Sequence, residues 1–400
     1  MLNTPFSPWP SFTEEEAEAV KRVLLSNKVN YWTGQECREF EKEFAAWCHT
    51  EYAIALANGT VALDLALKAL NIGPGDDVIV TPRTFLASAS SIVNAGARPI
   101  FADVDLDSQN ITAESIREVL TPNTRAVICV HLAGWPCEMD PIMALAEEKS
   151  FFVIEDCAQA HGAKYKGRPV GSIGHIGAWS FCQDKIMTTG GEGGMVTTND
   201  RGLWSKMWAY KDHGKSWEAV YERQHPPGFR WVHDSFGTNW RMIEIQAAIG
   251  RIQLRKMADW TKQRQTYSAQ INEAAQAFTC VRIPKVPAYI DHAAYKHYLF
   301  VKPAQLAVGW TRDRVVQTLT EQKVPCYQGS CSEVYLEKAF THTDYRPPNR
   351  LPRAAELGET SLMFLVHPTL SAVEMKTTCS SLTSILEAAS IKKPPTLSEQ

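Results

Sequence analysis

Apolar runs alternate with segments of helical periodicity through the first two-thirds of the chain. Strands are predicted at residues 52–57, 78–80, 99–104, 126–131, 151–155, 178–181 and 195–198. Helices are predicted at residues 61–70, 84–94 and 139–149, and after the capping residue Thr112. The strands are apolar throughout, which is typical of a parallel sheet with helices on both faces. The pattern predicts a doubly wound α/β domain, whose ligands bind at loops after the carboxyl ends of strands.

The character of the sequence changes after about residue 250. Residues 249–277 predict one long helix, and the signals beyond it are mixed short strands and helices. A chain of 400 residues also exceeds what one ordinary core holds. We therefore expect a large domain at residues 1–255 and a smaller α+β domain at residues 256–400, with a frayed tail at 392–400.

Charge and hydropathy exclude several classes of protein. The 41 Lys and Arg residues and 44 Asp and Glu residues give a net charge of −3, and the basic residues are scattered, unlike those of a nucleic-acid-binding surface. No apolar run approaches the roughly 18–20 residues of a membrane helix. The first ten residues lack the basic and apolar blocks of a secretory signal. We expect neither a nucleic-acid nor a membrane partner.

The ten cysteines form no C-x-x-C pair, and several, such as Cys129, lie inside apolar runs. We interpret them as reduced thiols that pack as small apolar groups, which favours a cytoplasmic location. A zinc site is the competing interpretation, but the cysteines lack its ligand spacing. His131, His161 and His175 lie in three different loops, so no metal is expected. His161 flanks an acidic loop and is a candidate for substrate contact.

Two loops after predicted strands carry residues suited to ion binding. The Asn-Gly-Thr sequence at residues 58–60 stands between a strand and a helix, where backbone N–H groups and the Thr60 hydroxyl could hold a phosphate. On its own, this tripeptide is better explained as an ordinary turn and cap. Glu155 and Asp156 end the most apolar strand. A carboxylate aimed at a protonated ring nitrogen or a metal and a solvated loop explain them equally well.

Lys185 precedes the glycine-rich loop at residues 190–194. In a phosphate-binding P-loop the lysine follows its glycines, so that motif is excluded. The order suits a lysine held in a pocket as a Schiff-base nucleophile, although a lone lysine is more often a surface residue. Phe85 follows another strand and could stack on a planar cofactor, although core packing is the better explanation for one aromatic residue.

Taken together, these motifs resemble the sugar-nucleotide aminotransferase family of the DegT/DnrJ/StrS type, whose members are fold-type-I enzymes using pyridoxal 5'-phosphate (PLP). The resemblance covers nearly the whole chain, and the order and spacing of the motifs make it specific. The motifs are Gly34-Gln35, Phe40-Glu41, 57–63, 73–76, Thr84-Phe85, 155–159, Ser180-Phe181, Lys185, 191–194, 239–242 and 246–250. The resemblance implies a large domain with a mostly parallel central sheet flanked by helices, and a smaller C-terminal domain.

The resemblance also implies a role for each matching residue. Lys185 is expected to form the Schiff base with PLP, and Asp156 to pair with the pyridine nitrogen. Gln159 is expected near the ring oxygen, and Phe85 on the face of the ring. The residues expected at the cofactor phosphate are Gly59, Thr60, Ser180 and, from the neighbouring subunit, Asn239. The last of these implies a homodimer with shared active sites.

The implied reaction is ping-pong transamination, in which L-glutamate loads the cofactor and a nucleotide-linked keto sugar unloads it. The Gly-Glu-Gly-Gly form of residues 191–194 resembles the family's 4-keto enzymes more than its 3-keto enzymes, which implies a 4-keto sugar as substrate. Such a product would serve surface polysaccharide synthesis, for example a lipopolysaccharide O-antigen. Arg83, His175 and Cys182 depart from the usual family pattern, which bears on contacts with the sugar.

Several alternatives stay open. One is a 3-keto sugar aminotransferase or a PLP-dependent dehydratase, although family dehydratases have His where this chain has Lys185. A dinucleotide-dependent oxidoreductase needs a G-x-G-x-x-G turn that residues 58–60 do not supply. A non-catalytic regulatory member of the fold is opposed by the joint presence of Asp156, Gln159 and Lys185.

Overall fold

The computed structural model describes residues 5–391, and the tail predicted at 392–400 lies outside them. Its largest feature is a seven-stranded sheet of order β1-β9-β8-β5-β4-β2-β3. The strands are β1 (Tyr52–Leu56), β2 (Asp77–Val80), β3 (Arg98–Phe101), β4 (Thr124–Val130), β5 (Phe152–Asp156), β8 (Ile176–Ser180) and β9 (Gly194–Thr198). The five strands from β8 to β3 run parallel, and β9 is antiparallel to both β1 and β8. The predicted mostly parallel sheet is confirmed.

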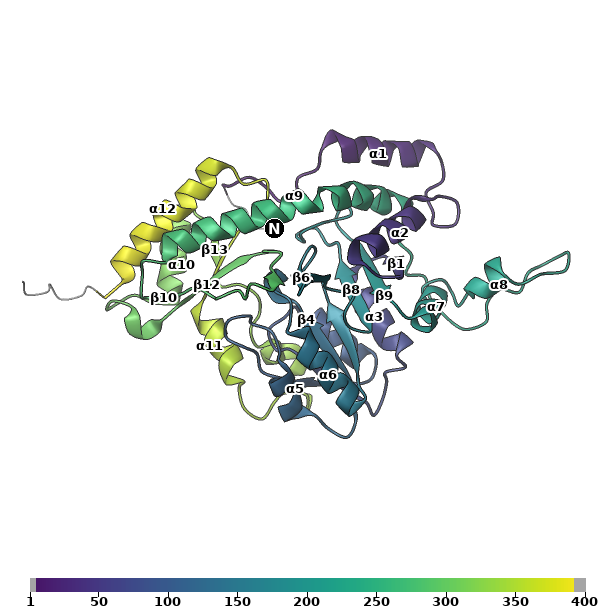
Figure 1. Cartoon of the computed structure of the whole chain (residues 1–400), viewed down its shortest axis with the longest axis horizontal. Helices are drawn as coiled ribbons and strands as arrows, with labels where there is room; N and C mark the ends of the chain where they lie inside the picture. Colours follow the sequence, from purple (N-terminus) through teal and green to yellow (C-terminus); the bar gives the residue numbers. More distant parts are fainter. Residues whose placement is uncertain (1–4, 392–400) are drawn as a thin grey trace, which may run out of the picture.

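Helices cover both faces of this sheet (Figure 1). One face packs against α3 (Gly59–Ala69), α4 (Ala87–Asn94) and α7 (Arg201–Tyr210). The other packs against α5 (Ala113–Val119), α6 (Met139–Lys149) and α2 (Glu36–Cys48). Strand β2 illustrates the consequence, because Val78 and Val80 belong to the core under α3 and α4, whereas Ile79 belongs to the core under α5 and α6. Successive side chains of a strand point to opposite faces, so burial on both faces demands apolar residues throughout.

Some element boundaries differ from the sequence prediction. The helix expected from residue 84 begins at Ala87, which leaves Thr84 and Phe85 in the loop after β2. The helix α1 (Glu14–Leu25) and α2 precede the first predicted element. A small sheet of β6 (Lys164–Tyr165), β7 (Arg168–Pro169) and β11 (Ile290–Asp291) was also not predicted. The short helix α8 (Trp217–Tyr221) and the loop after it project from the body of the molecule (Figure 1).

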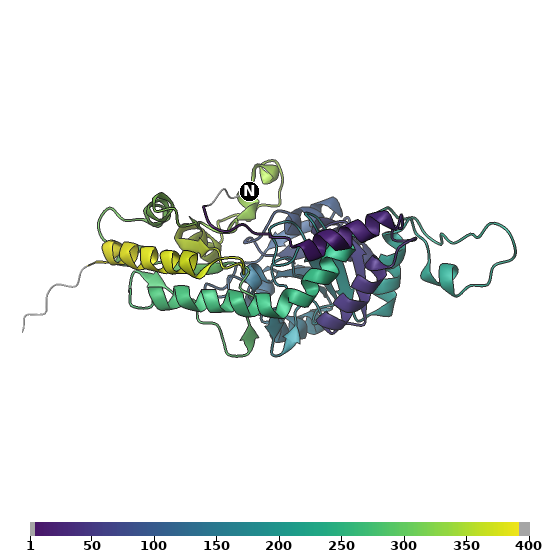
Figure 2. The ribbon, with the colours of Figure 1, turned by 90° about the horizontal axis from the view of Figure 1, so that it is seen from above.

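The C-terminal part is built on an antiparallel sheet of order β10-β12-β14-β13. Its elements are β10 (Val281–Arg282), β12 (His297–Val301), α10 (Arg312–Glu321), β13 (Cys326–Tyr327), α11 (Pro352–Thr360), β14 (Ser361–Phe364) and α12 (Ala372–Ala389). The long helix α9 (Glu244–Ala275) runs from α1 and α2 to α12 (Figures 1 and 2). The predicted division at residue 255 falls inside this continuous helix and stays a prediction.

The C-terminal part also returns to the large sheet. Val334, Tyr335 and Phe340 belong to the core under α3 and α4. The Val334 N–H donates a hydrogen bond to the Pro82 carbonyl in the loop after β2. This packing brings C-terminal residues against the loops at the carboxyl end of the parallel strands.

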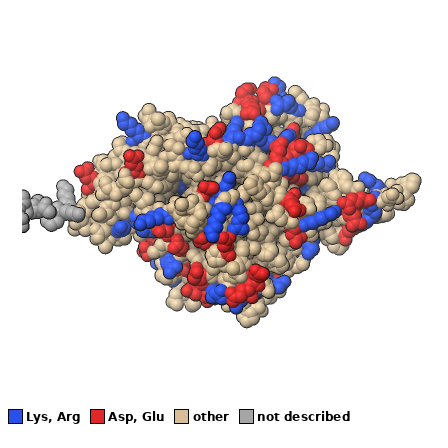
Figure 3. All heavy atoms as spheres, in the orientation of Figure 1, with Lys and Arg blue, Asp and Glu red and all other residues tan. Residues whose placement is uncertain are grey.

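Acidic and basic side chains are interspersed on the face shown in Figure 3. Across residues 5–391, no helix combines the length and apolar character needed to cross a membrane. All ten cysteines are free thiols, and most are buried, as predicted for small apolar groups. The chain therefore depends on its apolar cores rather than on disulfides for stability.

Candidate active site

A cavity of about 980 Å³ lies at the carboxyl end of the parallel strands. Phe85, Gln159 and Lys185 line it. Much of the remaining lining comes from parts of the chain that are distant in sequence, namely Phe6–Trp9, Tyr295, Lys296, Gly329–Cys331, Val334, Glu337, Met363, Leu365 and His367. The lining does not include Asp156, Gly59, Thr60, Ser180 or Asn239. The structure thus gathers three of the predicted residues in the cavity. Asp156 and Ser180 end β5 and β8, Gly59 and Thr60 begin α3, and Asn239 lies in an exposed loop.

Asp156 ends β5 with its carboxylate buried, so the solvated-loop interpretation is wrong. Its Oδ2 accepts a hydrogen bond from Ser88 Oγ at 2.8 Å, and its Oδ1 accepts one from the Ala158 N–H at 3.1 Å. Burial raises the pKa of Asp156, although the two hydrogen bonds and the charge of Lys185 oppose this rise. A buried carboxylate of this kind is stabilised in its charged form by a cation, such as a protonated pyridine nitrogen.

Lys185 is held from both sides at the cavity wall. Its side chain is 17% exposed, with Nζ 3.5 Å from Asp184 Oδ1 and 5.6 Å from the centre of the Tyr295 ring. Its backbone carbonyl accepts a hydrogen bond from Trp9 Nε1 at 2.8 Å. The glycine-rich loop packs beside it, because the Gln183 N–H donates to the Gly191 carbonyl at 2.9 Å. The amine is therefore presented to the cavity from a fixed backbone, as the sequence order suggested.

The N-terminus of α3 combines the two functions considered for residues 58–60. Asn58 caps the helix, because its Oδ1 accepts a hydrogen bond from the Val61 N–H at 3.0 Å. The N–H groups of Gly59 and Thr60 have no intrahelical acceptor at this end of the helix. A Cβ on Gly59 would lie 2.5 Å from Ser180 Cβ and 2.9 Å from Ser180 Oγ. Only glycine allows this approach, which sets a hydroxyl beside free N–H groups, an arrangement suited to a phosphate.

Gln159 presents a polar amide to the cavity, and Phe85 presents its flat ring. Gln159 Oε1 accepts a hydrogen bond from the Ala133 N–H at 2.9 Å, which fixes the amide and leaves its nitrogen as a donor. Phe85 is 71% exposed although it lines the cavity, so its ring is accessible to another ring. Asn239 lies at the surface, and its Oδ1 accepts a hydrogen bond from the Arg241 N–H at 3.4 Å. Within one chain it does not join the cavity.

These features fit PLP, which is a flat pyridine carrying a phosphate and an aldehyde. The α3 N-terminus with Ser180 suits the phosphate, and buried Asp156 suits the protonated ring nitrogen. The Lys185 amine can react with the aldehyde. Each chemical group of the cofactor has a matching residue within one connected region.

Comparisons with known proteins give the same assignment. Residues 10–383 match the DegT/DnrJ/EryC1/StrS aminotransferase family. The chain belongs to this family. It is a PLP-dependent aminotransferase with the predicted fold type I, and the oxidoreductase alternative is excluded.

Relatives of the aminotransferase match it along most of its length. It is 35% identical over 381 residues to GDP-perosamine synthase of Escherichia coli O157:H7, covering 93% of this chain and 96% of the relative. It is 36% identical over 375 residues to UDP-N-acetyl-3-dehydro-alpha-D-glucosamine 3-aminotransferase of Acidithiobacillus ferrooxidans, covering 92% of each. The crystal structure of an aminotransferase from Psychrobacter cryohalolentis superposes with a TM-score of 0.94 at 62% identity, covering 96% of this chain and 99% of the other.

Arg83, His175 and Cys182, which depart from the usual family pattern, lie in three different parts of the aminotransferase. Arg83 is wholly buried, and its guanidinium donates to Gln109, Ser332 and Ser361 at 2.7–2.9 Å. It ties the loop after β2 to the C-terminal part. His175 Nδ1 accepts a hydrogen bond from the Val153 N–H within the sheet. Only Cys182 lines the cavity, so it alone of the three is placed to contact a reactant.

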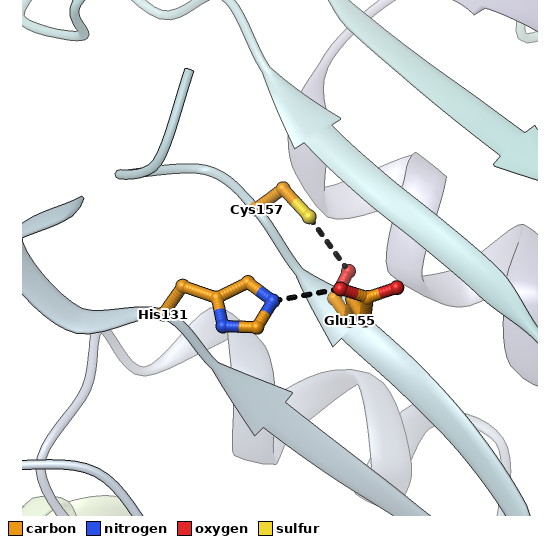
Figure 4. Close-up of side chains that lie close together, drawn as sticks. All are labelled: His131, Glu155 and Cys157. Atoms are coloured by element: carbon orange, nitrogen blue, oxygen red, sulfur yellow. Dashed lines mark hydrogen bonds and ion pairs between the residues drawn. The ribbon is translucent and has the colours of Figure 1, made fainter. Parts of the chain in front are cut away.

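Glu155 has a structural function that the sequence did not reveal. Its carboxylate accepts hydrogen bonds from the backbone N–H groups of Gly171, Ile173 and Gly174 and lies 2.9 Å from His131 Nε2 (Figure 4). Burial alone would raise the pKa of Glu155, but His131 and these N–H groups hold it below its usual value. Glu155 therefore anchors residues 171–174 beneath the site.

His131, Glu155 and Cys157 lie close enough together to suggest a metal site (Figure 4). His131 Nδ1 accepts a hydrogen bond from the Cys137 N–H, so its proton is on Nε2 and is donated to Glu155. The Cys157 thiol donates to the Glu155 carbonyl. Because the candidate ligand atoms are already engaged with one another or with backbone groups, the cluster is explained without a metal.

Sequence reasoning missed most of the cavity wall contributed by the C-terminal part. Tyr295 donates a hydrogen bond to Asp184 at 2.5 Å, and Lys296 lies beside it. Both precede β12 in a mixed segment without a recognisable motif. It also missed Trp9, because a single aromatic residue near the start of the chain is too weak a signal to indicate a site.

His161 was wrongly considered for substrate contact. Its side chain is buried against Trp179 and Phe181.

Replacing His161 by leucine should make the aminotransferase less sensitive to acid. Burial lowers the pKa of His161 from 6.5 to about 3, helped by the charges of Lys185 and Arg264. Between these values the unfolded chain binds a proton that the folded protein does not, so stability falls as pH drops from 6.5 towards 3. His161 contributes up to about 1.4 kcal/mol per pH unit to this loss.

Thermal denaturation at pH 7 and pH 5 tests this expectation. The melting temperature of His161→Leu should fall less between the two conditions than that of the wild type. His342→Leu at an exposed position is the control and should behave as the wild type does. An equal acid-induced loss in His161→Leu and the wild type would show that burial does not hold His161 neutral.

Proposed function

We propose that the enzyme transfers an amino group from L-glutamate to the C4 carbonyl of a nucleotide-linked keto sugar. The observation that carries this proposal is the single cavity shared by Lys185, Gln159 and Phe85, next to buried Asp156 and the open N-terminus of α3. Its volume of about 980 Å³ leaves room for a nucleotide-sized reactant beside a cofactor. GDP-perosamine synthase among the relatives supports a nucleotide-linked sugar, and the Gly-Glu-Gly-Gly form of residues 191–194 supports the 4-keto position.

When bound, PLP supplies an electron sink for the carbon that loses a proton during transamination. Asp156 would keep the ring nitrogen protonated by charge pairing, and the hydrogen bond from Ser88 fixes the carboxylate for this role. The Gln159 amide nitrogen would be available as a donor to the ring oxygen, and the exposed Phe85 ring would offer a flat surface to the cofactor ring. The Lys185 amine would be the group that holds and moves the proton at the substrate carbon.

The backbone N–H groups of Gly59 and Thr60 and the Ser180 hydroxyl would hold the phosphate. Asn239 completes this contact from a neighbouring copy, so we propose a homodimer with shared active sites. The exposed position of Asn239 is compatible with such a contact. The free cysteines suit a reducing cytoplasm. The product would enter surface polysaccharide synthesis, including lipopolysaccharide O-antigen.

Amination at C3 is the second candidate function. The Acidithiobacillus relative is a 3-aminotransferase by name and matches this chain over a similar length and at similar identity to the perosamine synthase. The dehydratase alternative is less well supported, because Lys185 is retained.

A panel of 4-keto and 3-keto sugar nucleotides linked to dTDP, UDP or GDP tests both candidates. With L-glutamate, mass spectrometry should detect an amino-sugar nucleotide and 2-oxoglutarate, and NMR should place the nitrogen at C4. Nitrogen at C3 would establish the second candidate. Loss of water without nitrogen transfer would establish a dehydratase, and the absence of any product across the panel would contradict the proposed function.

A further inference from the structure

We propose that Lys296 binds an anionic group of a reactant and thereby selects the substrates that the cavity accepts. The anion is either a carboxylate of the amino donor or the diphosphate of the sugar nucleotide. The inference rests on the proposed function, because both reactants are expected to enter this cavity in turn. It assigns Lys296 to binding and leaves proton transfer to Lys185.

Lys296 directly precedes β12 and lines the same cavity as Lys185. Its Nζ lies 4.7 Å from the centre of the Tyr295 ring, and Lys185 Nζ lies 5.6 Å from the same ring. The two amines therefore both lie close to one aromatic ring at the cavity wall. An anion bound by Lys296 would sit near the position at which a reacting carbon must meet Lys185.

Lys296 has no ion pair with an acidic side chain within residues 5–391. Burial lowers its pKa to about 8, with smaller contributions from the nearby charges of Arg264 and Lys185. Asp184 opposes this effect, but its carboxylate already accepts the Tyr295 hydroxyl and lies 3.5 Å from Lys185. A cation in such surroundings is costly unless a partner of opposite charge arrives.

Among the other charged and titratable groups near Lys296, Arg264 adds to the need for an anion. Arg264 is buried, and its Nε and Nη2 have no hydrogen-bonding partner among residues 5–391. Burial lowers the pKa of His367 to about 3, so this side chain is neutral. Glu337 is the other acidic residue of the cavity wall. The phosphate of PLP does not meet this need, because the groups suited to it lie at the N-terminus of α3.

Lys296→Gln and Lys296→Arg test the inference in the PLP-loaded enzyme. Calorimetry would measure the binding of glutarate, an unreactive dicarboxylate, and of UDP, GDP and dTDP. Steady-state kinetics would measure KM for the donor and for the sugar nucleotide. Lys302→Gln, at an exposed position just beyond the same strand, is the matched control.

In Lys296→Gln, loss of a charge-assisted hydrogen bond should weaken the binding of the affected anion by about 10- to 100-fold. The arginine variant and the Lys302→Gln control should stay within a few-fold of the wild type. A change confined to glutarate and the donor KM identifies a carboxylate as the bound anion. A change confined to the nucleotides and the sugar-nucleotide KM identifies the diphosphate.

The inference is overturned if all binding and Michaelis constants of Lys296→Gln match the wild type, or if only kcat falls. Its failure is distinct from failure of the proposed function. A wild-type enzyme that aminates no sugar nucleotide but binds these anions through Lys296 would retain the binding assignment. An enzyme that aminates its substrate independently of Lys296 would retain only the proposed function.

Discussion

Lys185→Ala should reduce transamination by about 10⁴-fold or more, because the variant loses both the nucleophile and the group that moves the proton. The change should not unfold the protein. The side chain is partly exposed to the cavity, and the contact with Trp9 uses the backbone carbonyl of Lys185, which alanine retains. Turnover with L-glutamate and a keto-sugar nucleotide measures the loss.

The covalent function of Lys185 can be measured without turnover. Borohydride reduction should fix the cofactor on the wild-type protein, so that intact mass spectrometry detects the added mass. Lys185→Ala should remain unmodified under the same treatment. Lys285→Ala, at an exposed position, should be modified and active like the wild type. A modified or active Lys185→Ala enzyme would mean that another amine carries the reaction.

Asp156→Asn should lower turnover by about 10²- to 10⁴-fold while leaving the cofactor-free fold intact. The size of the effect follows from losing a buried charge pair with the ring nitrogen, which is worth about 3–5 kcal/mol. Asparagine can keep both contacts, because its oxygen can accept the hydrogen bond from the Ala158 N–H while its NH2 group donates to the Ser88 hydroxyl, which can act as acceptor. Because burial raises the pKa of Asp156, its ionised form destabilises the cofactor-free protein at neutral pH, and asparagine removes this cost.

Two measurements separate these effects. Thermal denaturation of the cofactor-free proteins at pH 7 should give Asp156→Asn a stability equal to or above that of the wild type. Binding of PLP and turnover should both be weaker in the variant. Asp184→Asn is a useful comparison, because its carboxylate lies at the cavity wall and contacts Tyr295 rather than Ser88. Full turnover in Asp156→Asn would contradict the proposed pairing with the ring nitrogen.

The central sheet was predictable because burial on both faces leaves a strong signal. Val78, Ile79 and Val80 are all apolar because alternate side chains enter two different cores. The start of α4 was predicted too early, because Thr84 and Phe85 belong to a loop whose length no local periodicity specifies. The helices before residue 50 were not predicted, although α2 begins with acidic residues and places Phe40 and Phe44 on a buried face.

The candidate site was predictable where its residues follow strands in recognisable motifs. Lys185, Asp156 and Gln159 are of this kind. The local pattern alone did not distinguish the adjacent acids Glu155 and Asp156, because neighbouring strand residues point to opposite faces and the pattern does not say which face meets a ligand. Only the family resemblance assigned the ring nitrogen to Asp156. Trp9 and Lys296 could not be found at all, because tertiary contacts across more than a hundred residues bring them to the cavity.

The residues that line the cavity include Trp9 near the start of the chain and His367 near its end, so the cavity is completed late in synthesis of the protein. Ribosomes add about 5–20 residues per second, so these two parts of the wall emerge on the order of tens of seconds apart. The helices and strands around Asp156 and Lys185 can form during this interval, but the pocket is still open on one side. A nascent or truncated chain therefore exposes the reactive Lys185 amine to solvent. The amine is enclosed only after the lining residues up to His367 have folded into place.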